Sequence, residues 1–179
     1  MPQPAPTPSG TALRSGPHPR IVVMGVSGSG KSTLGVALAQ ALGVPFAEGD
    51  DFHSAANRAA MAAGHALTDA DRLPWLEALR TWAAARPAGC VLSCSALRRA
   101  YRDVLRGAGP DVVFLEVDVP REVLATRLAA RRGHFMPPSL LDSQLATLEP
   151  LADDEAGARL DGTQPVAELV TVARHVLSC

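Results

Sequence analysis

The stretch that decides the fold is IVVMGVSGSGKSTLGVALAQAL, residues 21–42. Its first four residues form a continuous apolar run, which is typical of a strand buried on both faces of a parallel sheet. Residues 31–42 favour a helix, and Gly43 follows as a helix-ending signal. Between strand and helix, residues 25–32 read GVSGSGKS and fit G-x-x-x-x-G-K-[ST]. This order of strand, glycine-rich loop and helix predicts a phosphate-binding loop.

The residue types in this loop suit phosphate chemistry. Glycines let the backbone turn so that successive N–H groups point toward phosphate oxygens, and the helix N-terminus adds about half a unit of positive charge. Lys31 contributes a compact ammonium, and Ser32 a hydroxyl for Mg²⁺ between the β- and γ-phosphates. We therefore expect ATP and Mg²⁺ as cofactors; a turn without a ligand is the alternative. The predicted nucleotide-binding residues here are Gly25, Ser27, Gly28, Ser29, Gly30, Lys31, Ser32 and Thr33, with Ser32 as metal ligand and Lys31 also catalytic.

The basic residues narrow the class of nucleotide-binding protein. Of the 17 Lys and Arg residues, Lys31 is the only lysine, so the Asn-Lys-x-Asp element by which guanine-specific switches read their base cannot occur. Large motor and AAA-type ATPases are disfavoured because they need a longer chain and an apolar strand ending in paired acids. The nearest match, residues 114–118, precedes Pro120 and a helix, and Glu116 and Asp118 are predicted to cap that helix. The small-molecule kinases remain.

Length and composition exclude several other classes. With 179 residues and 47% hydrophobic residues, the chain suits one folded domain. A formal net charge of −1 argues against sequence-independent binding of nucleic acid. No apolar run approaches the roughly 20 residues that span a bilayer, and the N-terminus lacks the order of a secretory signal. Three cysteines without a CxxC pair suit a reducing cytosol, so we expect a cytoplasmic protein.

The remaining pattern predicts an α/β fold, with three layers, a parallel sheet covered by helices on both faces, and a small lid. Residues 1–19 hold six of the 15 prolines and are predicted to be a disordered tail, followed by a kinase domain over 20–179 with its lid at about 131–140. Further strands are expected at 44–46, 90–94, 112–117 and 158–160, and further helices at 54–63, 73–85, 97–106, 120–131, 139–148 and 166–177.

An acceptor site is expected just after the second strand, which we place beside the strand of the phosphate loop. Phosphoryl transfer to an alcohol needs a carboxylate that orients the hydroxyl and takes its proton. Asp50 stands where such a base belongs, and Glu48 or Asp51 could help to hold Mg²⁺ through water. A helix cap or a solvated turn is the alternative for these acids. His53 is by itself more typical of a polar surface residue, but with Asn57 and Arg58 it could hydrogen-bond a polyol carboxylate.

Arginines supply the remaining predicted site residues. Arg98 follows the third strand, at the sheet edge where ligands bind in such folds, and it suits an acceptor that carries a carboxylate. Arg127, Arg131 and Arg132 crowd the end of one predicted helix. A mobile Arg over the γ-phosphate would neutralise charge that develops during transfer, and Arg131 is the preferred catalytic residue. Favourable interaction with the helix dipole is the alternative.

Two further expectations concern residues outside the site. Arg102 and Arg106, four residues apart, are predicted to lie on a solvated helix face. Cys90 and Cys94 share one face of a strand and are predicted to be buried in the hydrophobic core, without excluding a regulatory thiol.

Taken together, these stretches resemble the gluconokinases of the small P-loop kinase group. The resemblance covers most of residues 21–148. It is carried by MGVSGSGKST (24–33), EGDDFH (48–53), LTDADRLPWL (67–76), SCSALRRAYRDVLR (93–106) and RLAARRGHF (127–135), in the order of the family.

The resemblance implies ATP-dependent phosphorylation of D-gluconate at the 6-hydroxyl, in a protein that is commonly a homodimer. Asp50 would be the base on that hydroxyl, and Arg127 would stack on adenine, with Gln164 and Pro165 at the border of the base. The residues implied for the sugar acid are Asp50, His53, Arg58 and Arg98. The alternatives are a kinase for another small acceptor, such as shikimate or a nucleoside monophosphate, and an ATP-binding module without transfer activity.

Overall fold

The computed structural model describes residues 18–131 and 138–178. Most of the predicted tail, Arg132, most of the predicted lid and Cys179 lie outside the described residues. The last two residues of the predicted tail are placed, and the backbone N–H of His18 donates a hydrogen bond to the carbonyl of Ala88 at 3.1 Å. The chain is therefore already packed against the body of the protein at His18.

The described residues form one parallel sheet of five strands, in the order β2-β3-β1-β4-β5. Each of the four strand pairs is parallel, so every connection crosses over through a helical layer. β1, β3 and β4 consist almost entirely of apolar, buried residues, as expected for central strands covered on both faces. The strands are β1 (Arg20–Met24), β2 (Phe46–Glu48), β3 (Cys90–Ser93), β4 (Val112–Asp118) and β5 (Gly157–Asp161).

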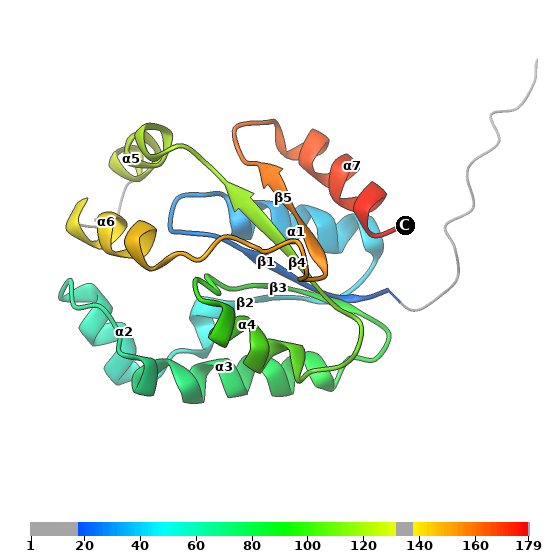
Figure 1. Ribbon diagram of the computed structural model, residues 1–179, viewed down its shortest axis with the longest axis horizontal. Coiled ribbons are helices and arrows are strands. Elements are labelled where there is room, and N and C mark those ends of the chain that lie inside the picture. Colours follow the sequence, from blue (N-terminus) through cyan, green and yellow to red (C-terminus); the bar gives the residue numbers. More distant parts are fainter. Residues whose placement is uncertain (1–17, 132–137, 179) are drawn as a thin grey trace, which may run out of the picture.

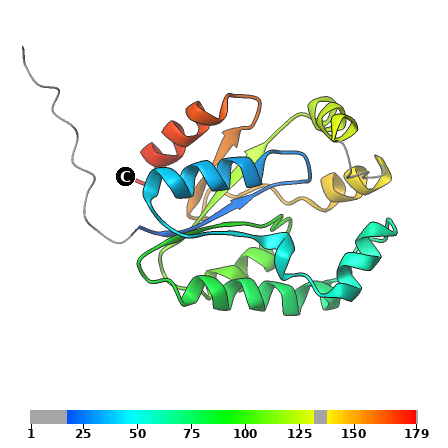
Figure 2. The same cartoon turned by 180° about the vertical axis from the view of Figure 1, so that it is seen from behind.

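Helices cover both faces of this sheet, and the predicted three-layer α/β fold is confirmed. Helices α1 and α7 lie on one face, while α3 and α4 lie on the other (Figure 1; Figure 2 shows the reverse view). Helices α2, α5 and α6 stand at the end of the sheet where β1 enters the phosphate loop. The helices are α1 (Lys31–Leu42), η1 (Gly49–Phe52, a 3-10 helix), α2 (Ala55–Ala62), α3 (Asp69–Ala84), α4 (Arg99–Arg106), α5 (Arg121–Ala130), α6 (Pro138–Thr147) and α7 (Val166–Val176).

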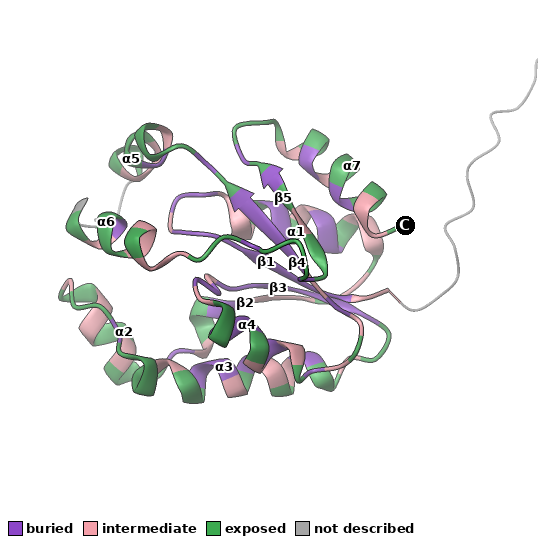
Figure 3. Ribbon diagram, viewed as in Figure 1, coloured by how far each residue is buried: buried purple, intermediate pink, exposed green. Residues whose placement is uncertain are grey.

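Two hydrophobic clusters hold the layers together, one on each face of the sheet. The first joins α1 and α7 to the sheet through residues such as Val23, Leu38 and Leu169, and the second joins α3 and α4 through residues such as Trp75 and Leu105. Figure 3 shows the buried residues concentrated on the strands and on the sides of the helices that face them. None of the helices in the described ranges is long and apolar enough to cross a membrane.

Two element boundaries differ from the prediction for local reasons. The second strand begins at Phe46, because Pro45 has no N–H for the ladder and only its carbonyl pairs, accepting from Val91 at 2.9 Å. Helix α3 begins at Asp69, where Thr68 and Asp71 form a capping box with hydrogen bonds in both directions. The helix therefore starts four residues before Leu73, where the sequence analysis expected it.

The prediction of a solvated face for Arg102 and Arg106 is wrong. Arg102 is 1% exposed and forms two hydrogen bonds to Glu155, from Nε at 2.8 Å and from Nη2 at 2.7 Å. It also donates to the carbonyls of Ala96 and Glu149. Arg106 is only partly exposed and bonds to the same Glu155. The partner is 53 residues away in the sequence, so the spacing along one helix could not indicate it.

The capping role predicted for Glu116 and Asp118 is also wrong. Helix α5 begins after Pro120 with no side-chain cap. Glu116 is buried and accepts a hydrogen bond from the backbone N–H of Leu151 at 2.7 Å, while Asp118 pairs with Arg159 of the neighbouring strand. β4 continues through Asp118, so both side chains belong to the sheet. The predicted burial of Cys90 and Cys94 is confirmed.

Candidate active site

The phosphate loop joins the end of β1 to the first turn of α1. Gly25, Gly28 and Gly30 have φ angles of 145°, 83° and 95°, which are strained for other residues. At Gly25 a Cβ would also lie 2.8 Å from Ser29 Oγ and 2.9 Å from the carbonyl of Val117. Gly30 is the N-cap of α1, and no side chain caps that helix. The amides of its first turn are therefore free of a capping side chain, as an anion site requires.

Two side chains from other elements contact this loop. The amide of Gln144, in α6, accepts from the N–H of Ser27 at 2.8 Å and donates to Ser27 Oγ at 3.2 Å. Arg127, in α5, donates to the carbonyl of Ser29 at 3.2 Å and to that of Gly162 at 2.8 Å. Ser29 Oγ itself is buried and has no hydrogen-bond partner in the described part of the chain. Side chains of α5 and α6 therefore hold the loop in place, and the Ser29 hydroxyl forms no hydrogen bond among the described residues.

Lys31 lies between the phosphate loop and the acidic residues that follow β2. Its Nζ is 3.5 Å from the carbonyl of Val26. Burial lowers the pKa of Lys31, whereas the carboxylates of Asp50 and Glu48 act in the opposite direction. These two acids are therefore close enough to act on the ammonium. We predicted that their strand, β2, lies directly beside β1. That prediction is wrong, because β3 lies between β2 and β1.

The end of β2 is fixed against β3 before the chain reaches Asp50. The Ser93 hydroxyl donates to Glu48 Oε1 and accepts from the N–H of Gly49 at 3.2 Å. A Cβ at Gly49 would lie 2.1 Å from the carbonyl of Ser93, so no other residue fits there. Trp75 Nε1 donates to the carbonyl of Gly49 at 2.8 Å. Asp50 follows this anchored residue within η1 and is exposed.

His53 is a buried part of the acceptor side and not an ordinary surface residue. Its ring stacks on Trp75, with centroids 4.2 Å apart and planes at 15°, and the residue is 6% exposed. Its Nδ1 is buried without a hydrogen-bond partner among the described residues. Burial lowers the pKa of His53, Asp50 opposes this effect, and Arg58 and Arg72 add to it. A neutral imidazole with a free nitrogen can bind a hydroxyl group.

The structure places the side chains of Asn57 and Arg58 on backbone groups. Arg58 donates to the carbonyl of His53 at 3.0 Å and to that of Asp51 at 2.9 Å, so it braces η1 from the first turns of α2. Asn57 donates to the carbonyl of Asp71 at 2.9 Å. The structure therefore brings Arg58 to the backbone of residues 51–53.

Arg98 takes part in a cluster that the sequence analysis missed. Its Nη1 donates to Asp69 Oδ2 at 3.2 Å, and Asp69 also accepts from the hydroxyl of Tyr101. That hydroxyl accepts from Arg72 Nη1 at 3.1 Å. The stretch around Asp69 and Arg72 carried part of the resemblance, yet no local pattern shows that it meets Arg98 and Tyr101, about 30 residues later in the sequence.

A cavity of about 290 Å³ opens beside the phosphate loop. Its lining comes from three separate segments of the chain. It includes Arg127 and Gln164, two of the three residues expected near adenine, together with residues of the loop. Pro165 is not part of the lining and instead precedes α7 as its N-cap. Gln164 is tied to Asp161 by a hydrogen bond at 3.0 Å. The lining residues are Gly28, Ser29, Gly30, Thr33, Arg127, Arg131, Gly162, Gln164, Val166 and Leu169.

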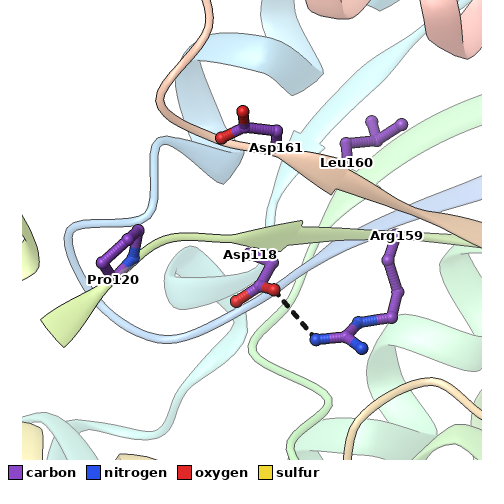
Figure 4. A pocket seen from close by; sticks show the side chains of 5 residues that line it. All are labelled: Asp118, Pro120, Arg159, Leu160 and Asp161. Carbon is purple, nitrogen blue, oxygen red and sulfur yellow. Dashed lines mark hydrogen bonds and ion pairs between the residues drawn. The ribbon is translucent and has the colours of Figure 1, made fainter.

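A second hollow of about 410 Å³ lies where β4 and β5 end (Figure 4). Asp118 and Arg159 face each other across the two strands and form a hydrogen bond at 2.9 Å. Among the described residues, Pro120, Leu160 and Asp161 complete the lining, and no predicted site residue belongs to it. This hollow is therefore separate from the predicted site residues.

Comparisons with known proteins identify the family and the fold. A family model described as "AAA domain" matches residues 21–151. The gluconokinase of Gluconobacter oxydans (strain 621H) is 48% identical over 159 residues, covering 87% of this chain and 89% of that protein. An unliganded sugar kinase from Janibacter sp. HTCC2649 has a TM-score of 0.85 at 51% identity, covering 90% and 95% of the two chains. A gluconokinase from Sinorhizobium meliloti 1021 has a TM-score of 0.84 at 47% identity, covering 91% and 93%.

Proposed function

Because this chain belongs to the gluconokinases and to the family that the AAA domain model describes, we propose that it phosphorylates D-gluconate with ATP. The γ-phosphoryl group passes to the 6-hydroxyl, and the products are 6-phospho-D-gluconate and ADP. The observation that carries the proposal is the shared environment of Lys31 and Asp50. The exposed carboxylate of Asp50 acts electrostatically on the ammonium of Lys31, as expected where a phosphate loop and a base for transfer to an alcohol share one site.

The residues present fit a nucleoside triphosphate. The first turn of α1 has no capping side chain, and the buried Ser29 hydroxyl has no partner among the described residues. In the proposal, the loop amides and Lys31 bind the phosphates. Arg127 and Gln164 border the base from the cavity beside the loop, with Pro165 next to them in the chain.

Three other residues fit Mg²⁺, which would neutralise phosphate charge when bound. Ser32 would contribute its hydroxyl, and Glu48 or Asp51 would act through water. Glu48 is already oriented by Ser93, which makes it the better ordered of the two acids. Hydroxyl and carboxylate oxygens are the ligands that this cation prefers.

On the acceptor side, Asp50 acts as general base. It takes the proton of the 6-hydroxyl while that oxygen bonds to the γ-phosphorus, and the bond from the γ-phosphorus to the bridging oxygen of ADP breaks. Arg131 lines the nucleotide cavity and acts electrostatically on Lys31, so it is placed to stabilise charge that develops on the transferred group. His53, Arg58 and Arg98 bind the sugar acid.

A coupled assay of ADP release by the purified chain tests the proposal. ADP formation should depend on D-gluconate and should be absent with shikimate, a nucleoside monophosphate or no acceptor. Lys31→Ala should abolish transfer and leave the circular dichroism spectrum unchanged. ADP release with one of the other acceptors alone would transfer the substrate assignment to it, and ATP binding without turnover would identify a binding module.

We also propose that the protein is a homodimer, in keeping with the resemblance. We further propose that it is cytoplasmic, in keeping with the absence of a CxxC pair. The two free cysteines within the described residues are both buried, and burial raises the pKa of Cys94 to about 12. A thiol of this kind is unreactive. Sedimentation equilibrium of the full chain measures the oligomeric state, and a species of one-chain mass at assay concentrations would refute the dimer.

A further inference from the structure

Two arginines from different helices meet around one aspartate at the edge of the acceptor side. Arg72 lies in the first turn of α3 and Arg98 precedes α4, yet both guanidiniums lie near the ring of Tyr101, at 5.4 and 5.9 Å from its centroid. Both also pair with Asp69, Arg98 at 3.2 Å and Arg72 at 3.9 Å. We call Asp69, Arg72, Arg98 and Tyr101 the arginine cluster.

The arginine cluster has more cationic donors than its own acceptors use. A guanidinium carries five N–H donors. Arg72 gives one hydrogen bond to Tyr101 and Arg98 one to Asp69, and neither has another within the described part of the chain. Two positive charges face the single negative charge of Asp69. The side chain of Arg98 is 43% exposed and that of Arg72 is 19% exposed, so both are open to a ligand.

A different ion pair on α3 shows that this imbalance is specific to the cluster. Arg80 donates to Glu77 at 2.7 Å, one guanidinium to one carboxylate, two turns further along the same helix. That pair is an ordinary i,i+3 surface pair whose charges cancel. In the arginine cluster, by contrast, Arg98 and the Tyr101 hydroxyl donate to the carboxylate of Asp69, and Arg72 Nη1 lies 3.9 Å from it.

His53 connects the segment of the proposed base to the helix of the arginine cluster. Its backbone N–H donates to the carbonyl of Asp50 at 3.3 Å, and its ring stacks on Trp75, which follows Arg72 by three residues in α3. D-Gluconate is an open chain with its reacting hydroxyl on C6 and its carboxylate on C1. An acceptor whose C6 hydroxyl meets Asp50 therefore extends past His53, whose buried Nδ1 has no partner among the described residues.

We propose that Arg72 and Arg98 together bind the carboxylate of the acceptor, and that Asp69 and Tyr101 position their two guanidiniums. The inference rests on the proposed function and adds Arg72, Asp69 and Tyr101 to the site. It assigns the specificity for acids over neutral polyols to this cluster. A carboxylate held by two guanidiniums gains charge-assisted hydrogen bonds that an alcohol group at the same carbon cannot form.

The test compares D-gluconate with D-glucitol, which has an uncharged CH₂OH group in place of the carboxylate. Arg72→Met should raise the KM for D-gluconate about 10- to 100-fold, the usual effect of losing hydrogen bonds to a charged group. The kcat and the KM for ATP should change less than about threefold, since those depend on the other end of the site. The preference for D-gluconate over D-glucitol in kcat/KM should fall by the same factor as the KM rises.

Arg80→Met is the matched control, because it removes an arginine from the same helix outside the cluster; its KM for D-gluconate should stay at the wild-type value. Arg72→Lys keeps the charge without the planar fork and should recover part of the loss. If Arg72→Met does not fold, Arg98→Met gives the same comparison from the other side of the carboxylate.

The outcomes separate this inference from the proposed function. Wild-type protein that does not phosphorylate D-gluconate refutes the proposed function, and the inference falls with it. Wild-type activity together with an unchanged KM in both Arg72→Met and Arg98→Met overturns only the carboxylate assignment. An equal loss on D-gluconate and D-glucitol also overturns it, because that result indicates a structural role.

Discussion

The side-chain amide of Gln144 forms two hydrogen bonds with Ser27, one to the backbone N–H and one to the hydroxyl. The two residues are 117 positions apart, and the contact joins α6 to the phosphate loop. In the proposed function, Ser27 lies in the loop that binds the nucleotide phosphates. The side chain at position 144 is therefore next to the phosphate site. Its charge should affect the KM for ATP more than its shape does.

Gln144→Glu should raise the KM for ATP about tenfold, because a negative charge is placed beside the phosphate site. The carboxylate keeps an oxygen that accepts from the N–H of Ser27, so the melting temperature should change little. Ser143→Ala, at the exposed neighbouring position of α6, is the control and should leave both quantities unchanged. An unaltered KM for ATP in Gln144→Glu would show that Ser27 lies away from the phosphates.

Asp50→Asn should lower kcat by about two to four orders of magnitude, the usual contribution of acid–base catalysis, with the affinity for ATP nearly kept. Asp51→Asn changes the next residue of η1 in the same way and should lower kcat less than Asp50→Asn does, because Asp51 would act on Mg²⁺ only through water. Steady-state kinetics with both substrates varied checks this pair. Equal losses in the two variants would mean that the charge of the segment is required and not a base at position 50.

Arg131→Met should lower kcat by about 1,000-fold at saturating ATP and D-gluconate, if its cation stabilises the transferred group. Arg121 is an exposed arginine of α5 that pairs with Asp142, and Arg121→Met should leave kcat unaffected. Single-turnover measurements distinguish a loss in the chemical step from slow product release. A change in the KM for ATP alone would assign Arg131 to nucleotide binding only.

Glu155 should make the protein sensitive to acid. Hydrogen bonds from Arg102, helped by a backbone N–H and by Arg106, lower the pKa of Glu155 to about 2 from 4.5. Because the pKa is lower in the folded state, this stability is fully present above pH 4.5 and is lost as the pH falls toward 2. At about 1.4 kcal/mol per unit, the loss is roughly 3 kcal/mol.

Urea unfolding between pH 7 and pH 3 measures this effect. Glu155→Gln should be less stable than the wild type at pH 7, because Arg102 is left buried without a counter-charge, and its stability should depend less on pH in the acid range. Glu77→Gln removes a partly exposed carboxylate paired with Arg80 and should retain the slope of the wild type. A Glu155→Gln slope equal to that of the wild type would exclude Glu155 as the source.

Much of the fold could be predicted because its signals are local. The apolar runs of β1, β3 and β4 and the helices between them indicated a parallel sheet, and the glycines of residues 25–30 coincide with positive φ angles. In β5 (Gly157–Asp161) only one residue is buried, and pairing with β4 makes it a strand. The position of Asp50 after β2 was also predictable, but not the insertion of β3 between β2 and β1.

The residues that sequence reasoning missed or misplaced share one property, which is that their partners are distant in the chain. Arg102 reads as a surface residue until Glu155 packs against it, and Arg72 has no evident role until Tyr101 is brought beside it. His53 resembles a polar surface residue until Trp75 covers its ring. Neither hydrophobic periodicity nor motif spacing contains this information.

The amino-acid sequence alone determined the strand, glycine loop and helix that can bind a phosphate chain, because backbone conformation there depends on the residues at those positions. It also determined which side chains were available as base and cation. Only the tertiary structure decided which side chains meet: it placed Gln144 on Ser27, and it brought Arg72 and Arg98 together at Asp69. The order in which parallel strands assemble depends on packing between segments far apart in the chain, which no short stretch specifies.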